Sequence, residues 1–324
     1  MATNFKLGLK WHTPPERTTL TCRAITVPRM KVCVLGAGTM GNGIAQVTAM
    51  AGHDVTMRDI EREFVEDGLA TIESNLQGGV DRDKVTPEEM EATLARIDTA
   101  VELEPAVAGA DLVVEAVPEQ MDLKKDTFAD VEAAIDEDTV IATNTSSLSI
   151  TEIASALEHD ERAVGLHFFN PVHLMQLVEV VVPEQSSEET VAFAEAFVEG
   201  IDRTAVTVRD SAGFASSRLG VTLGVEAIRM LEEGVASPRD IDAAMELGYN
   251  HPMGPIELGD VVGLDVRLDI LEYLREELGE RFKPPQLLKQ KVRAGKLGKK
   301  TGEGFYVWED GEIVGTSGDW GDGQ

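Results

Sequence analysis

A histidine and a glutamate stand twelve positions apart inside one apolar, strand-forming stretch of the chain. His167 lies in the first half of the stretch 163–181, and Glu179 interrupts its equally apolar second half. A buried charged group costs free energy unless it is paired or used. Two readings follow: His167 is a hydrogen-bonded core residue, or the two side chains form an acid–base pair. An imidazole with a pKa of about 6.5 suits proton transfer at neutral pH, and a carboxylate partner fixes its tautomer and raises its basicity.

Short apolar segments alternate with helical patterns over the first two thirds of the chain. This alternation predicts an α/β fold with a doubly wound parallel sheet. The predicted strands include residues 31–35, 54–58, 111–117, 139–144 and 162–169. Ligands of such sheets bind beyond the carboxyl ends of the strands. Glu115, Asn144 and His167 each stand at or near such an end, which makes them candidate site residues.

The first predicted strand runs into a glycine-rich turn, Gly36-Ala37-Gly38-Thr39-Met40-Gly41, and then into a helix. The second strand ends at Asp59, 21 positions after Gly38. Together these features form a dinucleotide-binding pattern. Gly36 allows the tight turn, Gly38 the approach of a pyrophosphate to the helix N-terminus, and Gly41 close helix–strand packing. Asp59 is expected to bind the adenosine ribose and repel a 2′-phosphate, which favours NAD over NADP.

The 324 residues suffice for about two domains. After residue 209 the strand pattern stops and amphipathic helical stretches take over. We therefore expect a dinucleotide-binding domain over residues 30–209 and an all-helical domain over residues 210–308. A helical excursion at about 61–96 is longer than a simple crossover needs. Residues 309–324 are rich in Gly and Asp and are expected to form a loose tail.

Residues 1–29 differ from the remainder in composition, with five basic residues and a single acidic one. A transit peptide is one reading, because such segments are rich in Arg and poor in acidic residues. The interpretation that we favour is that Met30 is the true start, and that the extension is disordered or not native.

The composition excludes several classes of protein. The formal net charge of −29 gives a surface that repels phosphate backbones, which argues against nucleic acid as a partner. An acidic excess of this size is typical of adaptation to molar salt, where the Debye length falls to about 3 Å.

No apolar run approaches the roughly 18 to 20 residues of a membrane span. The two cysteines, Cys22 and Cys33, argue against a disulfide framework, and we expect a cytoplasmic protein. No residue spacing indicates a metal site.

Five segments, in order, resemble the 3-hydroxyacyl-CoA dehydrogenases of β-oxidation: GAGTMGNGIAQ, NTSSLSITEIA, GLHFFNPVHLMQLVEVV, DIDAAMELGYNHPMGPIELGDVVGLD and GKKTGEGFY. The resemblance runs from Met30 to about Trp308. It implies a Rossmann-like NAD-binding domain, a helical C-terminal domain that forms a homodimer, and an active site in the cleft between the domains. The excursion at about 61–96 resembles the family's helical arm over the CoA moiety.

The resemblance also implies roles for single residues. The family's catalytic histidine and glutamate fall on His167 and Glu179, so that His167 takes the proton of the 3-hydroxyl as hydride leaves C3 for the nicotinamide. The family's serine in NTSS falls on Ser146, which would hydrogen-bond the substrate oxygen. Its glutamate after the fourth strand falls on Glu115, near the nicotinamide ribose. For Asn144, in the same motif, a turn-forming and a ligand-facing role carry equal weight.

The chain departs from the family at Ser217, in GFASSR, where the family often has an asparagine that points at the substrate. A serine is shorter but still donates one hydrogen bond. The leading hypothesis is an NAD-dependent L-3-hydroxyacyl-CoA dehydrogenase, with 3-hydroxybutyryl-CoA as the expected short substrate. Two alternatives stay open: a dehydrogenase of a free hydroxy acid such as a sugar acid, and an NAD-binding structural or regulatory protein without turnover.

Overall fold

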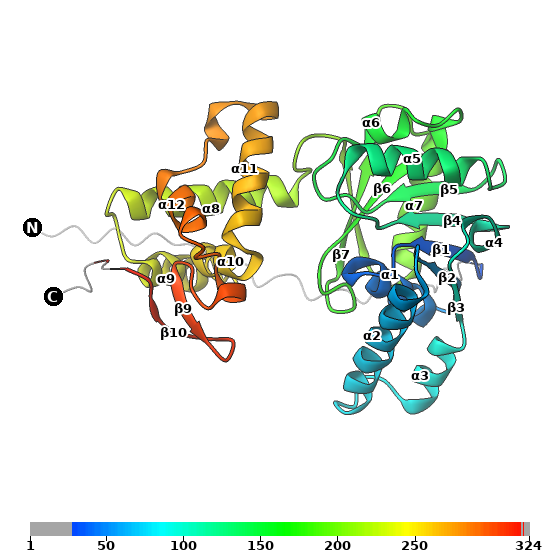
Figure 1. Cartoon of the computed structure of the whole chain (residues 1–324), viewed down its shortest axis with the longest axis horizontal. Helices are drawn as coiled ribbons and strands as arrows, with labels where there is room; N and C mark the ends of the chain where they lie inside the picture. Colours follow the sequence, from blue (N-terminus) through cyan, green and yellow to red (C-terminus); the bar gives the residue numbers. More distant parts are fainter. Residues whose placement is uncertain (1–27, 319, 321–324) are drawn as a thin grey trace, which may run out of the picture.

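The computed structural model describes residues 28–318 and 320, so the extension expected at residues 1–29 lies almost wholly outside the described residues. The described residues form a sheet flanked by helices and a separate helical part beside it (Figure 1). Helix α8 (Ser216–Glu232) is the first helix of the helical part and reaches toward the sheet. The predicted α/β class with a second, helical domain is confirmed.

Eight strands form one sheet in the order β3-β2-β1-β4-β5-β6-β7-β8. The strands are β1 (Lys31–Leu35), β2 (Asp54–Arg58), β3 (Ile97–Ala100), β4 (Leu112–Glu115), β5 (Val140–Thr143), β6 (Ala163–Phe168), β7 (Leu177–Val182) and β8 (Thr204–Arg209). All neighbouring strands are parallel except β6 and β7, where the sheet departs from the predicted parallel arrangement. A parallel return needs a long crossover, whereas the connection 169–176 contains no helix and therefore brings β7 back antiparallel.

Helices cover both faces of the sheet. They are α1 (Thr39–Met50), α2 (Arg62–Val80), α3 (Pro87–Leu94), α4 (Leu103–Val107), α5 (Met121–Glu132), α6 (Ile150–Ala154) and α7 (Glu188–Gly200). Val32 and Val34 of β1 belong to a core shared with α1, α2 and α7, whereas Cys33 and Leu35 pack with α4, α5 and α6. Burial on both faces explains why β1 is apolar throughout after Lys31. Burial also raises the pKa of the Cys33 thiol to about 12, so this cysteine is an unreactive core residue.

The predicted helical excursion consists of α2 and α3. Thr86 caps α3, because its hydroxyl accepts the N–H of Glu89 at 3.1 Å while the Glu89 carboxylate accepts the N–H of Thr86 at 2.8 Å. At its other end, α2 packs tightly on the glycine-rich turn: a Cβ on Gly68 would lie 2.7 Å from the carbonyl oxygen of Ala37. The base of the excursion is therefore fixed beside the expected cofactor site.

The helical part contains α8, α9 (Pro238–Tyr249), α10 (Pro255–Val262), α11 (Leu264–Leu278) and α12 (Gln286–Arg293), and then the hairpin of β9 (Tyr306–Glu309) and β10 (Glu312–Thr316). Asp260 on α10 is completely buried and ties the hairpin to the helices. Its carboxylate accepts the backbone N–H groups of Phe305 and Tyr306, each at 2.9 Å, and the indole N–H of Trp308 at 3.0 Å. Among residues 28–318, no helix has both the length and the apolarity needed to span a bilayer.

The prediction of a loose tail from residue 309 was wrong for residues 309–316. These residues complete the hairpin, because Asp310 and Gly311 adopt positive φ angles of 49° and 86° between β9 and β10. An Asp-Gly pair with both φ angles positive is a preferred two-residue hairpin turn. The sequence EDGEIV therefore contained a turn signal that the composition of the tail concealed.

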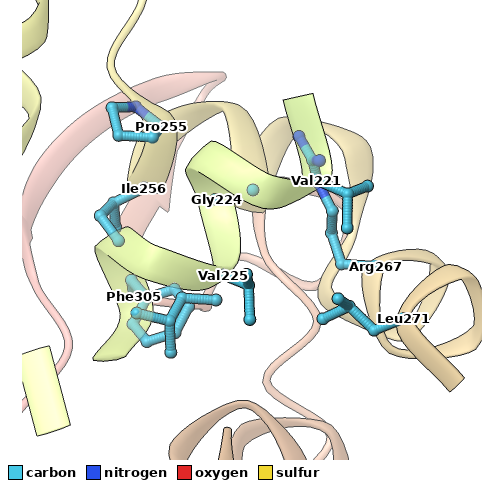
Figure 2. A pocket seen from close by; sticks show the side chains of 10 residues that line it. Val221, Gly224, Val225, Pro255, Ile256, Arg267, Leu271 and Phe305 are labelled. Atoms are coloured by element: carbon cyan, nitrogen blue, oxygen red, sulfur yellow. The ribbon is translucent and has the colours of Figure 1, made fainter. Parts of the chain in front are cut away.

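A buried cation without a hydrogen-bonded acceptor, Arg267, interrupts the apolar interior of the helical part as the structure describes it. A cavity of about 10 Å³ between α8, α10 and α11 is lined mainly by apolar side chains, and Arg267 reaches from α11 toward Gly224 at its wall (Figure 2). Arg267 is 9% exposed, and its Nε has no hydrogen-bond partner among the described residues. Burial lowers the pKa of the guanidinium. This cation therefore costs the helical part free energy that no described acceptor offsets.

Candidate active site

The glycine-rich turn has the shape that its sequence predicts. Gly36 has φ +98°, and a Cβ there would lie 2.6 Å from the carbonyl oxygen of Ala116. A Cβ on Gly41 would lie 1.7 Å from the carbonyl oxygen of Gly36, so only glycine allows this close approach of helix and turn. By contrast, a Cβ on Gly38 would meet no atom within 4 Å. The turn is therefore closed on the protein side and open at Gly38, where a ligand can approach the backbone.

The start of α1 adds unpaired N–H groups to this opening. Gly38 is the N-cap of α1 and supplies no side chain, so the N–H groups of Thr39 and Met40 at the first turn are left for a ligand. Asp59, just after β2, accepts the N–H of Ala37 at 2.7 Å and therefore stands beside the turn. An open backbone cradle, a helix N-terminus and an adjacent carboxylate fit the pyrophosphate and ribose of a dinucleotide.

Glu115 lies deeper than the resemblance implies. It is completely buried and forms an ion pair of 2.7 Å with Lys124, which is 1% exposed. Its carboxylate also accepts the N–H of Val117 and the hydroxyl of Thr143, each at 2.7 Å. These contacts hold the ends of β4 and β5 and the loops that follow them in place from the interior of the protein. A group so enclosed has no free face for a ribose.

The carboxylate that does reach Ser146 is that of Glu119. Its Oε1 accepts the N–H of Ser146 at 2.9 Å and the hydroxyl of Thr145 at 2.6 Å, and its Oε2 lies 3.3 Å from Lys124. Burial alone would raise the pKa of Glu119, but the charge of Lys124 and the hydrogen bonds from Thr145 and Ser146 hold it below its usual value. Ser146 is exposed, and its hydroxyl lies 3.3 Å from Oε1 of Glu119.

Asn144 supports the end of a neighbouring strand. Its side-chain oxygen accepts the backbone N–H of Phe168 at 2.9 Å, and its own N–H donates to the carbonyl of Glu115 at 2.8 Å. These bonds join the carboxyl ends of β4, β5 and β6 next to His167. Of the two roles weighed for Asn144, the local structural one therefore has direct support from its contacts.

His167 and Glu179 face each other across the antiparallel pair of β6 and β7. The register places His167 directly opposite Glu179, and Nδ1 lies 2.8 Å from Oε2 of the carboxylate. Both side chains are buried, with 7% and 1% of their surfaces exposed. With Glu179 ionised, the shared proton resides on Nδ1 and the ring is held in one orientation. The two residues that the sequence singles out are therefore in contact.

Glu179 is an anion held by four donors. Besides His167, it accepts the N–H groups of Ala215 at 3.2 Å and Ser216 at 2.8 Å, and the hydroxyl of Ser216 at 2.8 Å. Burial alone would raise the pKa of Glu179, but the hydrogen bonds from His167 and from the backbone and side chain of Ser216 lower it. Ser216 is a contact that the sequence did not predict.

The other ring nitrogen of His167 is left for chemistry. Within residues 28–318, Nε2 of His167 has no hydrogen-bond partner, while the rings of Phe169 and Phe214 flank the imidazole with centroids at 4.4 and 5.6 Å. A neutral imidazole with Nδ1 occupied presents Nε2 as a proton acceptor. The arrangement can therefore accept a proton at Nε2 and stabilise the resulting imidazolium through Glu179.

Ser217 follows Ser216 at the start of α8 and is partly exposed. Its side chain forms no hydrogen bond with any described residue, so it is available to a ligand. No group of three His, Cys, Asp or Glu side chains in the described part of the chain is arranged to hold a metal ion.

Comparison with known proteins gives two family matches. The family model described as 3-hydroxyacyl-CoA dehydrogenase, NAD binding domain, matches residues 31–211. The model described as 3-hydroxyacyl-CoA dehydrogenase, C-terminal domain, matches residues 213–308. The two matches together cover the sheet part and nearly all of the helical part.

Individual relatives match most of this chain and nearly all of their own length. A probable 3-hydroxybutyryl-CoA dehydrogenase of Bacillus subtilis is 43% identical over 281 residues, which are 86% of this chain and 98% of that protein. The crystal structure of (S)-3-hydroxybutyryl-CoA dehydrogenase PaaH1 from Ralstonia eutropha has a TM-score of 0.84 and 40% identity, covering 87% of this chain and 100% of that one. A diketoreductase structure has a TM-score of 0.73 and 30% identity, covering 87% of this chain and 100% of its own.

Proposed function

The chain belongs to the 3-hydroxyacyl-CoA dehydrogenase family, and from this premise we propose that its His167 and Glu179 carry out the NAD-dependent interconversion of 3-hydroxyacyl-CoA and 3-oxoacyl-CoA. The observation that carries the proposal is the 2.8 Å contact of these buried side chains, with Nε2 of His167 left free. A core histidine would not need a carboxylate held by three further donors. The resemblance predicted from the sequence is confirmed, and the chain is an oxidoreductase with NAD as its cofactor.

The opening at Gly38 and the first turn of α1 would hold the pyrophosphate of NAD, and Asp59 would bind its adenosine ribose. When bound, NAD supplies the acceptor for the hydride that leaves C3 of the substrate. A negative charge at Asp59 disfavours the 2′-phosphate of NADP, which is why we assign NAD.

In oxidation, Nε2 of His167 removes the proton of the 3-hydroxyl group. The ring becomes an imidazolium, which Glu179 stabilises through the 2.8 Å contact at Nδ1. In reduction, the same imidazolium donates its proton to the oxygen that develops at C3. Ser146 and Ser217, both accessible and with hydroxyl groups, are the proposed contacts of the substrate oxygen and acyl group.

We assign the CoA moiety to the arm formed by α2 and α3. The substrate is an anion and the chain has a net charge of −29, so local basic groups are needed. Such groups exist near the connection of β6 and β7, where Arg203 and Arg82 lie close enough to His173 for their positive charges to lower the pKa of its imidazole, as burial also does. Arg82 lies just after α2 and Arg203 just before β8. We propose that the two arginines attract the phosphates of CoA, and that the neutral imidazole of His173 beside them offers a hydrogen bond.

We further propose a homodimer that functions in the cytoplasm. Large apolar side chains are exposed on the helical part, including Leu219 at 70%, Leu247 at 88% and Tyr249 at 75%. Such a surface suits contact with a second copy. The net charge of −29 supports the further hypothesis that the protein works in concentrated salt.

The test is a nicotinamide absorbance assay on the chain starting at Met30, in molar KCl, with acetoacetyl-CoA as substrate. We expect rapid oxidation of NADH, slower oxidation of NADPH, and no oxidation with a free 3-oxo acid. The His167→Ala variant should lose about 10²- to 10⁴-fold in turnover, the usual contribution of a positioned acid–base group.

Wild-type protein that binds NADH but reduces only the free acid would transfer the assignment to hydroxy-acid dehydrogenases. Binding of NADH without turnover on either substrate would indicate a structural or regulatory protein. Normal turnover in the His167→Ala variant would show that the assignment of His167 is wrong. Circular dichroism checks that the variant is folded, because a loss of turnover in an unfolded variant says nothing about the role of His167.

A further inference from the structure

We infer that Ser216 is a positioning residue of the acid–base pair, whose hydroxyl group limits the basicity of Glu179 and ties the pair to the first turn of α8. The inference rests on the proposed dehydrogenase activity of the same site. It concerns a residue that touches neither the reacting atoms nor the cofactor, and that acts through Glu179.

The two oxygens of Glu179 are occupied in different ways. Oε1 accepts two backbone N–H groups, those of Ala215 at 3.2 Å and Ser216 at 2.8 Å. Oε2 accepts two side-chain donors, Nδ1 of His167 and the hydroxyl of Ser216, each at 2.8 Å. The hydroxyl of Ser216 and the imidazole of His167 therefore donate to the same carboxylate oxygen. Removing the hydrogen bond from Ser216 alters the strength of the hydrogen bond from His167.

The hydroxyl group of Ser216 is not used by the helix that carries it. Other helices in this chain begin with a serine whose hydroxyl accepts a backbone N–H, as Ser187 does for α7 and Ser237 for α9. The N-cap of α8 is Ala215, which provides no side-chain cap, and the hydroxyl of Ser216 turns to Glu179 instead. Its loss should therefore change the pair more than it changes the helix.

The groups that surround the pair are mostly uncharged. Those that face it from the neighbouring elements are the ring of His167 itself on β6, Val206 beside Glu179 on β8, the N–H and O–H groups of Ala215 and Ser216, and the rings of Phe169 and Phe214. Of these groups, only the imidazole of His167 is ionisable. In such surroundings each hydrogen bond to the carboxylate has a large effect on its affinity for protons.

The backbone before α8 is shaped to bring these donors to the pair. Phe214 has φ +48°, a left-handed conformation that is uncommon for a bulky residue. Its ring lies 5.6 Å from that of His167, and the next two residues present their N–H groups to Glu179. The position of α8 relative to the sheet is therefore transmitted to the acid–base pair by Ser216.

The experiment measures the oxidation of 3-hydroxybutyryl-CoA by NAD as a function of pH. Oxidation requires an ionised Glu179 and a neutral His167, and the acid limb of the profile belongs to the pair as a unit. Without the hydroxyl of Ser216 the carboxylate binds protons more tightly, so in Ser216→Ala the acid limb should move upward by roughly half to one pH unit. At the optimum, kcat should fall about 3- to 30-fold, with the KM for NAD unchanged.

Two further variants define the effect. Ser216→Thr restores the hydroxyl group and should recover both kcat and the acid limb. Thr222→Ala removes an exposed hydroxyl of the same helix, which donates at 2.7 Å to the carbonyl of Arg218, and should behave as wild type. A Ser216→Ala variant with the wild-type kcat and acid limb would overturn the inference. Equal impairment of the Ala and Thr variants at every pH, together with lower thermal stability, would assign Ser216 a purely structural role.

A second readout does not depend on turnover. The ring C–H resonances of His167, followed by NMR across the same pH range, report the titration of the pair in wild type and in Ser216→Ala. If wild type and Thr222→Ala are both inactive, the proposed function fails. The NMR midpoint still tests Ser216 separately: a midpoint in Ser216→Ala that differs from wild type supports its positioning role, and an unchanged midpoint contradicts it.

Discussion

At the scale of residues, the site depends on pairs of groups in which one does the chemistry and the other fixes its state. Glu179 fixes the tautomer of His167, and Ser216 and Ala215 fix the orientation of Glu179. Because the pKa of Glu179 is held below its usual value, this carboxylate loses its charge only in acid. Its stabilising effect is therefore present above the ordinary range of glutamate and is lost as the pH falls through its lowered pKa.

Asp59 is expected to determine cofactor choice by charge alone. In Asp59→Asn the side chain keeps an oxygen that can accept the N–H of Ala37, but it no longer repels a 2′-phosphate. We expect the preference for NADH over NADPH, measured as the ratio of kcat/KM values, to fall about tenfold or more, equivalent to roughly 1.4 kcal/mol. The control is Asp98→Asn, which removes the same charge from an exposed position on β3. An unchanged ratio would mean that Asp59 does not face the ribose.

The residues that could be identified from the sequence are those that carry a local signal. His167 and Glu179 stand out because charged groups interrupt an apolar run, and the glycines because they follow a strand. Ser216 and Glu119 carry no such signal, since their contacts join positions 37 and 27 residues apart. Glu115 was misplaced for the same reason: its sequence position at a strand end does not reveal that Lys124 buries it.

At the scale of elements, the strand–turn–helix unit at the front of the sheet shows two different uses of glycine. The Gly41 position is closed by the backbone of Gly36, so its lack of a side chain serves packing. The Gly38 position is open, so its lack of a side chain serves only a ligand. One unit therefore separates a folding requirement from a binding requirement within four residues.

This separation predicts opposite outcomes for two alanine variants. Gly41→Ala places a Cβ 1.7 Å from a carbonyl oxygen and should lower the free energy of unfolding by about 1–3 kcal/mol or more. Gly38→Ala meets no protein atom, so its thermal stability should match wild type while its Kd for NADH rises. Thermal unfolding and a fluorescence titration with NADH measure the two quantities. A stable Gly41→Ala protein would show that the turn can shift.

The buried carboxylate of Asp260 should give the helical part a measurable pH dependence. Burial raises the pKa of Asp260 although three N–H groups act to lower it, so the folded state binds its proton more tightly than the unfolded state does. Stability contributed at this site therefore falls as the pH rises through the interval between the ordinary value of about 3.9 and the raised value.

Asp260→Asn tests this dependence, because the amide cannot accept all three N–H groups and does not titrate. We expect the variant to be less stable by about 1–3 kcal/mol, the cost of an unsatisfied buried donor. The difference from wild type should widen as the pH falls from neutral and become constant below the ordinary pKa of aspartate. Asp269→Asn, an exposed change on α11, is the matched control. A difference that is independent of pH would contradict the raised pKa.

Regular sequence patterns predict the central strands of the sheet well, and they predict its edge strand β3 and the direction of β7 poorly. The buried strands β1, β4, β5 and β6 could be located because each is a mainly apolar run, and β2 because its apolar residues alternate with polar ones. Strand β3 was missed, since only Ile97 of its four residues is buried and its pattern is too short to distinguish from a loop. The antiparallel course of β7 follows from a short connection rather than from the strand itself, and β10 is held by a two-residue turn inside a polar tail.

At the scale of the whole molecule, charge and architecture are linked. The chain has 58 acidic and 29 basic residues, and two of the basic ones, Arg82 and Arg203, lie near His173 beside the proposed substrate site. The two domains meet at Ser216, where the helical part supplies donors to a glutamate of the sheet. A shift of the helical part relative to the sheet therefore acts on the active site as well as on stability.

The net charge of −29 predicts that salt stabilises the protein. Screening shortens the Debye length from about 10 Å at 0.1 M to about 3 Å at 1 M, which weakens repulsion between surface carboxylates. We expect the temperature of unfolding to rise steadily between 0.1 M and molar KCl, to an extent that the Bacillus subtilis relative, measured in parallel, does not show. No rise in either protein would remove the hypothesis of adaptation to salt.

The antiparallel turn of the chain between β6 and β7 also has an evolutionary consequence. His167 and Glu179 are matched by strand register, not by the length of the connection 169–176 between them. Residues can therefore be inserted or deleted at the exposed tip around Leu174 without separating the two partners, provided that both strands keep their alignment. The same tip lies beside His173, where the substrate is proposed to bind. Changes in the length or sequence of this loop can therefore alter substrate binding during evolution, while the positions of His167 and Glu179 stay the same.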